Sequence, residues 1–170
     1  VNSLHTRDPY RLCAMKDITL LFRNDFVRQK GSFHVILNRE FIFINANLSE
    51  QMQRMVCAHE LGHAVLHREL GKSKLGLVEF EIMDINSVAE LEANLFAGEL
   101  LLDEGELVEY VQQGWDLLSI ARAMDTNINM LLIRVNAYNS EHDAKLTLPE
   151  MPSRNFMGTI NDDTENYDPC

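Results

Sequence analysis

The chain has 170 residues, 46% hydrophobic and 24% charged, with 26 acidic and 15 basic side chains and a formal net charge of −11. That length suits one domain with a small appendage, and so acidic a chain is a poor match for nucleic acid or an anionic membrane surface. We find no run of roughly 20 apolar residues, as a membrane span requires, and no secretion signal at the start of the sequence. The three cysteines are too far apart for a disulfide framework. We therefore expect a cytoplasmic protein with no membrane partner and no direct nucleic-acid partner.

The first part of the chain predicts a short helix followed by strands. Asp8 precedes Pro9, as at a helix start. Residues 18–22 form a short apolar run, and residues 33–44 hold two more such runs separated by a polar turn. We expect residues 33–44 to form a hairpin within a small antiparallel or mixed sheet.

The hydrophobic period becomes helical at about residue 47, with Asn47 or Ser49 as the N-cap and Gly71 as the stop after Leu70. Apolar residues occur nearly all round this helix, so we expect it at the centre of the fold. Buried helices rarely carry two histidines and a glutamate without a reason. One face of the helix, at about 100° per residue, is shared by Met52, Met55, Val56, His59, His63 and Leu66.

The predicted central helix contains the run His59-Glu60-Leu61-Gly62-His63. Histidines at i and i+4 project from one face a turn apart and can bind one zinc ion through their ring nitrogens. Glu60 sits about 100° round the helix, where it can take a proton from metal-bound water and pass it to a leaving amine. The same pattern arises by chance in solvated helices, but the apolar surroundings favour the metal site. We predict His59 and His63 as metal ligands and Glu60 as the catalytic base.

A catalytic zinc normally takes a third protein ligand, and the next predicted helix offers one. Glu90 shares a face with the small residues Ala93 and Ala97, which would let this helix approach the histidine helix closely. Glu92 falls on the opposite side, towards solvent. We predict Glu90 as the third ligand; the alternative is that it only caps its own helix together with Ser87.

Two further side chains are candidates for contacts around the metal or the substrate. Asn94 lies one turn beyond Glu90 and can hydrogen-bond a ligand, holding its orientation. His67 continues the histidine face by another i+4 step, so it can reach the site, although a polar histidine at a helix end is the alternative. Cys57 lies about 160° round the helix from His59 and is expected to be a core thiol.

These residues resemble the ImmA/IrrE family of bacterial metallopeptidases. The resemblance is carried by residues 59–67 (HELGHAVLH) and residues 90–102 (ELEANLFAGELLL), and it extends loosely over residues 8–139. Asp103 is a departure, since the family commonly has proline there. The resemblance implies an α+β fold in which a small sheet packs on a central HExxH helix, a zincin-like (gluzincin) core. It also implies that zinc is the cofactor.

Membership of such a family would imply a biological role as well. By resemblance to this family, we expect a site-specific endopeptidase of a mobile element or stress regulon. Such a peptidase cleaves a helix-turn-helix repressor encoded nearby and so relieves repression. Manganese stays open as the metal, because histidine and carboxylate ligands suit several divalent cations. Two alternatives also stay open: a non-catalytic regulator that binds the repressor, and a regulator that binds DNA.

The C-terminal part of the chain looks like a helix-turn-helix, with helices over residues 116–124 and 128–138. Residues 105–139 hold only 2 basic against 4 acidic residues, and Arg134 is the one base on the second helix. A DNA-reading helix presents Arg or Lys to phosphates, so we favour a structural or substrate-docking role.

The domain organisation follows from these patterns. We expect a metallopeptidase core over residues 1–104 and a helical, helix-turn-helix-like region packed on it over residues 105–139. Residues 140–170 hold most of the prolines and many acidic residues, so we expect an extended or disordered tail there.

Overall fold

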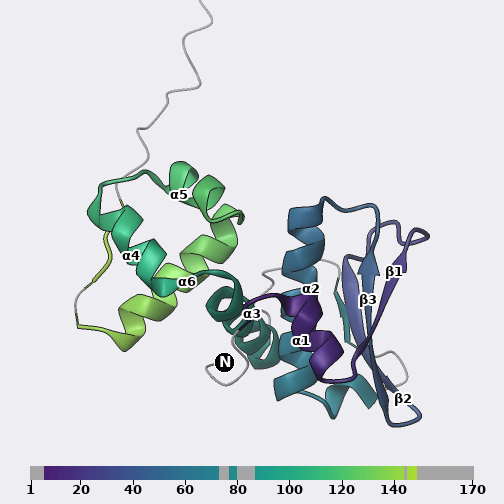
Figure 1. Ribbon diagram of the computed structural model, residues 1–170. Helices are drawn as coiled ribbons and strands as arrows, with labels where there is room; N and C mark the ends of the chain where they lie inside the picture. Colours follow the sequence, from purple (N-terminus) through teal and green to yellow (C-terminus); the bar gives the residue numbers. More distant parts are fainter. Residues whose placement is uncertain (1–5, 73–76, 80–86, 144, 149–170) are drawn as a thin grey trace, which may run out of the picture.

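The computed structural model describes residues 6–72, 77–79, 87–143 and 145–148, with residues 77–79 described as backbone only. Helices and a small mixed sheet build the fold (Figure 1), so the expected α+β class is confirmed. Within these residues, no helix is long and apolar enough to cross a membrane.

The elements follow the chain in the order α1 (Pro9–Met15), β1 (Thr19–Arg23), β2 (Gly31–Ile36), β3 (Arg39–Asn45), α2 (Glu50–Leu66), a 3-10 turn (Leu70–Lys72), β4 (Leu77–Glu79), α3 (Val88–Leu101), α4 (Glu104–Gln112), α5 (Leu117–Ala123) and α6 (Ile128–Glu141).

The four strands form one sheet in the order β1-β3-β2-β4. Strand β3 runs parallel to β1 and antiparallel to β2, and β4 pairs antiparallel with the other edge of β2. Leu37 and Asn38 connect β2 to β3 with φ values of 48° and 62°, and two successive positive φ values are typical of a type I′ hairpin turn. The hairpin predicted over residues 33–44 is therefore confirmed.

Helix α2 lies between the sheet and α3, and the bundle of α4, α5 and α6 lies beyond α3, away from the sheet (Figure 1). The buried face of the sheet carries Phe33, Ile42 and Ile44, all 0% exposed, in one hydrophobic cluster with Met55 and Leu61 of α2. Because α2 is covered by the sheet on one side and by α3 on the other, His59, Glu60 and His63 in its second half are enclosed.

Helix α2 begins at the N-cap Ser49, whose hydroxyl oxygen accepts a hydrogen bond from the Met52 amide. It ends at Leu66, one turn earlier than the predicted end at Leu70, which is therefore wrong. The backbone leaves helical geometry at His67, with φ −129° and ψ 33°. Gly71, predicted to stop the helix, lies in the separate 3-10 turn that follows.

Cys57 lies in the core, as expected. It is 0% exposed, and its sulfur lies 3.8 Å from the sulfur of the equally buried Cys13 on α1. The neighbouring thiol and burial both raise the pKa of Cys57, so it stays protonated. This thiol contributes packing between α1 and α2.

The C-terminal helices are held together around one buried cation. Arg134 of α6 is 1% exposed, and its NH2 lies 2.7 Å from Glu104 of α4 and 3.2 Å from Glu99 of α3. Helix α6 runs to Glu141, and Leu146 packs against the core after it. Most of the expected acidic tail lies outside the described residues, and the three-part division of the chain stays a prediction.

Candidate metal centre

Two imidazole rings meet in the interior beside α3. His59 and His63 lie one turn apart on α2, are 0% and 1% exposed, and bring their Nε2 atoms to 3.0 Å from each other. This is the arrangement that the i, i+4 spacing predicts for a helix.

Glu90, in the first turn of α3, completes the group. Its Oε2 lies 3.2 Å from Nε2 of His59 and 3.4 Å from Nε2 of His63. The three donor atoms all lie within 4.8 Å of one another and could hold one metal ion. The Ser87 hydroxyl accepts a hydrogen bond from the backbone N–H of Glu90, so the backbone is capped while the carboxylate points to the histidines.

The two helices approach closely because small residues face each other between them. A Cβ atom on Gly62 would lie 3.1 Å from Cα and 3.2 Å from the carbonyl oxygen of Ala93, and 3.2 Å from the Phe96 ring. These distances are tighter than ordinary van der Waals contact, so α2 meets the backbone of α3 directly. Ala93 was among the small residues expected at this contact. Gly62 was not, although its place inside the His-Glu-x-x-His run was a usable signal.

Asn94 contacts the outer nitrogen of His59, as its position predicted. Its Oδ1 lies 2.8 Å from Nδ1 of His59. An amide oxygen only accepts, so Nδ1 of His59 carries the proton and Nε2 keeps a lone pair directed at the shared point. Asn94 thereby selects the tautomer that can bind a cation.

His67 and Glu92 form a second outer chain of contacts, on His63. Nδ1 of His67 lies 3.2 Å from Nδ1 of His63, and Nε2 of His67 lies 2.8 Å from Oε2 of Glu92. A neutral His67 that donates to the carboxylate through Nε2 accepts at Nδ1 from His63, which leaves a lone pair on Nε2 of His63. Glu92 is exposed, as expected, but its contact with His67 was missed. The i, i+2 offset from Glu90 gave no signal for that contact.

Glu60 is 0% exposed and packs beside strand β2. A Cβ atom on Gly31, the first residue of that strand, would lie 2.7 Å from Oε1 of Glu60 and 2.4 Å from the Val56 side chain. Only a glycine leaves room for the carboxylate at this place. The sequence gave no reason to single out Gly31.

Burial and the interactions among the three donors act in opposite directions on their pKa values. Burial lowers the pKa of His63 below its ordinary value, so the ring is neutral at pH 7. Burial alone would raise the pKa of Glu90, but its interactions with the two histidines outweigh that effect and hold the pKa below the ordinary range. A carboxylate and two neutral imidazoles with converging lone pairs form a donor set that fits a divalent cation.

Comparison with known proteins places the chain in a family. The model of Peptidase_M78, the IrrE N-terminal-like domain, matches residues 14–141. The chain belongs to this family. The match spans every element from β1 to α6, and it includes both helices that carry the donor atoms.

Two relatives of this IrrE-like chain are informative. It is 31% identical over 121 residues to the uncharacterized immunity region protein 2 of Bacillus phage phi105, covering 71% of this chain and 75% of that protein. It is 33% identical over 116 residues to the metallopeptidase ImmA of Bacillus subtilis, covering 63% of each chain. The chain thus spans a little under two thirds of the ImmA protein. Family membership and these matches support a metallopeptidase with a link to mobile elements.

Proposed function

We propose that this protein is a zinc-dependent, site-specific endopeptidase whose substrate is a helix-turn-helix transcriptional repressor encoded near its own gene. The observation that carries the proposal is the convergence of His59, His63 and Glu90 on one point, with Glu60 on the adjacent position of the same helix. Membership of a peptidase family and a relative from a phage immunity region support the reaction class and the setting.

His59, His63 and Glu90 would hold the metal, with manganese as the alternative to zinc. When bound, such a cation polarises the scissile carbonyl and makes a coordinated water more acidic. Asn94 and His67 keep the two rings in the tautomers and orientations that binding requires. On this proposal the fold forms a zincin-like core, in which α2 carries the ligands and the base together.

Glu60 serves as the proton carrier. Its carboxylate accepts the proton of the attacking water and then delivers it to the nitrogen of the departing amine. Packing against Gly31 limits the positions open to this carboxylate and keeps it beside the ligands. Burial of the whole group limits access of bulk water, which strengthens each electrostatic contact.

Direct DNA binding is less well supported. Arg134, the one base on the second helix of the helix-turn-helix-like region, is 1% exposed and paired with Glu99 and Glu104. It cannot reach a phosphate without breaking both ion pairs. The repressor, and not its operator, is therefore the expected partner.

The test uses purified zinc-loaded protein and the helix-turn-helix protein encoded by the neighbouring open reading frame. The native chain should cut that protein at one site, seen as two fragments by intact mass. Glu60→Gln should lower the rate by about 100-fold or more while retaining the metal, because it removes the proton carrier and leaves the ligands. Glu50→Gln, an exposed glutamate at the start of the same helix, is the matched control and should cut normally.

Undiminished cleavage by Glu60→Gln would contradict the mechanism. Tight repressor binding without cleavage by the zinc-loaded native chain would favour a non-catalytic regulator instead. Metal content of each variant, measured by plasma mass spectrometry, shows whether a loss of activity reflects loss of the cation.

A further inference from the structure

A groove of about 910 Å³ lies between α3 and α6, outside the cluster of metal-ligating residues. Its floor is apolar and formed by Leu91, Leu95 and Phe96 of α3 with Ile133 and Ala137 of α6. Leu91 is 41% and Leu95 36% exposed, so these large apolar side chains meet solvent side by side on one helix. Neighbouring exposed apolar side chains in a groove offer a surface that an apolar partner segment could cover.

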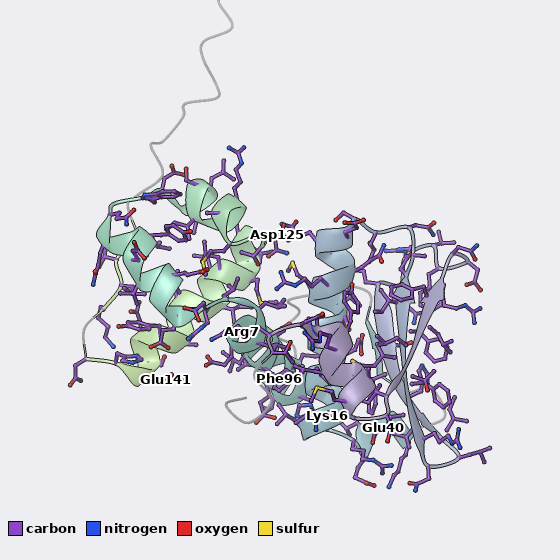
Figure 2. All side chains as sticks on the ribbon, in the orientation of Figure 1. Arg7, Lys16, Glu40, Phe96, Asp125 and Glu141 are labelled. Carbon is purple, nitrogen blue, oxygen red and sulfur yellow. The ribbon has the colours of Figure 1, made fainter. Side chains whose placement is uncertain are left out.

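The rim of the groove is acidic. Glu92 and Glu99 border it from α3, and Glu141 borders it from the end of α6. Figure 2 labels Phe96 and Glu141, which line the groove from its two helices. Neither lysine nor arginine is among the described residues that line it. Arg134 pairs with Glu99 from the protein side but shares its single positive charge with Glu104, so the groove keeps net negative charge at its rim and apolar surface at its floor.

The groove borders the candidate metal centre. Glu92 lines the groove and contacts His67, and His67 contacts the ligand His63. Leu91 follows Glu90 directly in the chain, and Leu66 is in the last turn of the histidine helix. A polypeptide lying in the groove would therefore have its next residues beside the three donors.

We propose that this groove docks an amphipathic helix of the protein substrate whose apolar stripe is flanked by lysines and arginines. The proposal rests on the proposed endopeptidase function and adds the chemistry of the recognised segment. A helix is the fitting shape because the groove is walled by two helices with apolar residues at i, i+4 spacing, Leu91 with Leu95 and Ile133 with Ala137. Basic flanks complement the three carboxylates.

Charge also argues against two other occupants of the groove, residues 149–170 of this chain and a second copy of the chain. Residues 149–170 of the chain itself carry five acidic residues and one basic residue, the wrong sign for this rim. A second copy of the chain brings a net charge of −11 to an acidic surface, which opposes self-association there.

The test measures binding apart from hydrolysis. The host is the full chain with Glu60→Gln, and the probe is a fluorescein-labelled amphipathic peptide of about 18 residues, with leucines at i, i+3, i+4 and i+7 and lysines elsewhere. Fluorescence anisotropy should show saturable binding that weakens as salt rises, because rim charges contribute. A peptide with glutamates in place of the lysines should not bind.

Two pairs of variants locate the binding. Leu95→Ser in the groove should weaken binding of the lysine peptide about tenfold, whereas Leu132→Ser should leave it within about twofold. Leu132 is the matched control because it is 38% exposed, against 36% for Leu95, and lies on α6 outside the groove.

Glu141→Lys should weaken binding several-fold at low salt only, whereas Glu109→Lys, at an exposed position on α4, should leave binding unchanged. If Leu95→Ser does not fold, Leu91→Ser replaces it.

Equal binding of the lysine and glutamate peptides, or normal binding by both groove variants, would overturn the proposal. So would displacement of the lysine peptide by a synthetic peptide of residues 149–166, or a dimer in sedimentation velocity that Leu95→Ser dissociates. Cleavage assays separate this proposal from the proposed function. If Leu95→Ser cuts the repressor normally while Glu60→Gln does not, only the docking site fails; if no variant cuts but the peptide still binds, only the peptidase function fails.

Discussion

On one side of α3, the Glu90 carboxylate faces two imidazole rings of α2; on the other, the Arg134 guanidinium of α6 faces two carboxylates. The side chains are enclosed to different degrees, 21% exposed for Glu90 and 2% for Arg134. The important difference is in the partners. Glu99 and Glu104 carry full charges opposite to that of Arg134, whereas burial keeps the partner His63 of Glu90 neutral.

We call Arg134 the structural charge, because its partners are carboxylates of the protein itself. We call Glu90 the binding charge, because its partners are neutral rings. Around Arg134 the protein supplies its own counterions, so the guanidinium needs no outside anion and its ion pairs link α3, α4 and α6. Around Glu90 the lone pairs of His59 and His63 point to the carboxylate, and the three donors could hold a cation. The charge of the partners, and not the degree of enclosure, thus distinguishes a cluster that links helices from one that could bind a cation.

The largest expected effect tests the binding charge. Glu90→Gln should raise the dissociation constant for zinc at least about 100-fold, because an anionic ligand becomes a neutral amide while the histidines remain. Isothermal titration of the metal-free protein measures it. Arg134→Met, which changes the structural charge, should leave zinc affinity within about twofold; an equal loss in both variants would mean that the two clusters are not independent.

A smaller effect is expected when the structural charge loses its counterions. The double variant Glu99→Gln/Glu104→Gln should lower the free energy of unfolding by about 2–3 kcal/mol, because the buried guanidinium is left without an anion. The loss should be smaller than for a fully buried ion pair, because both carboxylates are partly exposed. Urea denaturation of the metal-free protein measures it.

Two further variants sharpen the interpretation of that loss. Arg134→Met removes the charge itself and should cost less than the double variant, since an apolar side chain needs no counterion. Glu106→Gln, on the same first turn of α4 but exposed, should change stability by no more than about 0.5 kcal/mol. A double variant as stable as Glu106→Gln would show that Arg134 needs no counterion.

The smallest expected effect is on the contact that brings the donors together. Gly62→Ala should lower the free energy of unfolding by about 1–2 kcal/mol, because the added methyl group meets the Ala93 backbone and the Phe96 ring. It should also weaken zinc binding by separating Glu90 from the histidines. Gly105→Ala on α4, where the added atom meets only a side-chain oxygen of the N-cap Asp103, should be neutral or stabilise by less than about 1 kcal/mol. Equal stability of the two variants would contradict the close contact.

Local periodicity was enough to predict that the three candidate ligands lie together. His59 and His63 converge because the i, i+4 spacing fixes their directions on any helix, and Glu90 follows from the same geometry on α3. The hairpin was predictable because two short β-forming runs flank a turn. Residues 116–124 and 128–138 coincide closely with α5 and α6, since capping residues and breaks marked their limits.

The sequence pattern could not predict contacts between side chains of different helices and strands. The contact of His67 with Glu92 requires the crossing of α2 over α3, and the role of Gly31 requires the position of β2 against Glu60. The early end of α2 at Leu66 was also missed, because helix-forming residues continue beyond it. The partners of Arg134 come from two other helices, and charge counting alone shows neither.

The Gly62–Ala93 contact has a consequence for how the three candidate ligands are brought together. Main-chain atoms meet there, so the spacing between the histidine pair and Glu90 does not depend on the rotamer of any side chain between the helices. The backbone contact is enough to set that spacing without help from a cation. Metal binding therefore does not have to bring the two helices together, and little of its free energy is spent on ordering the chain.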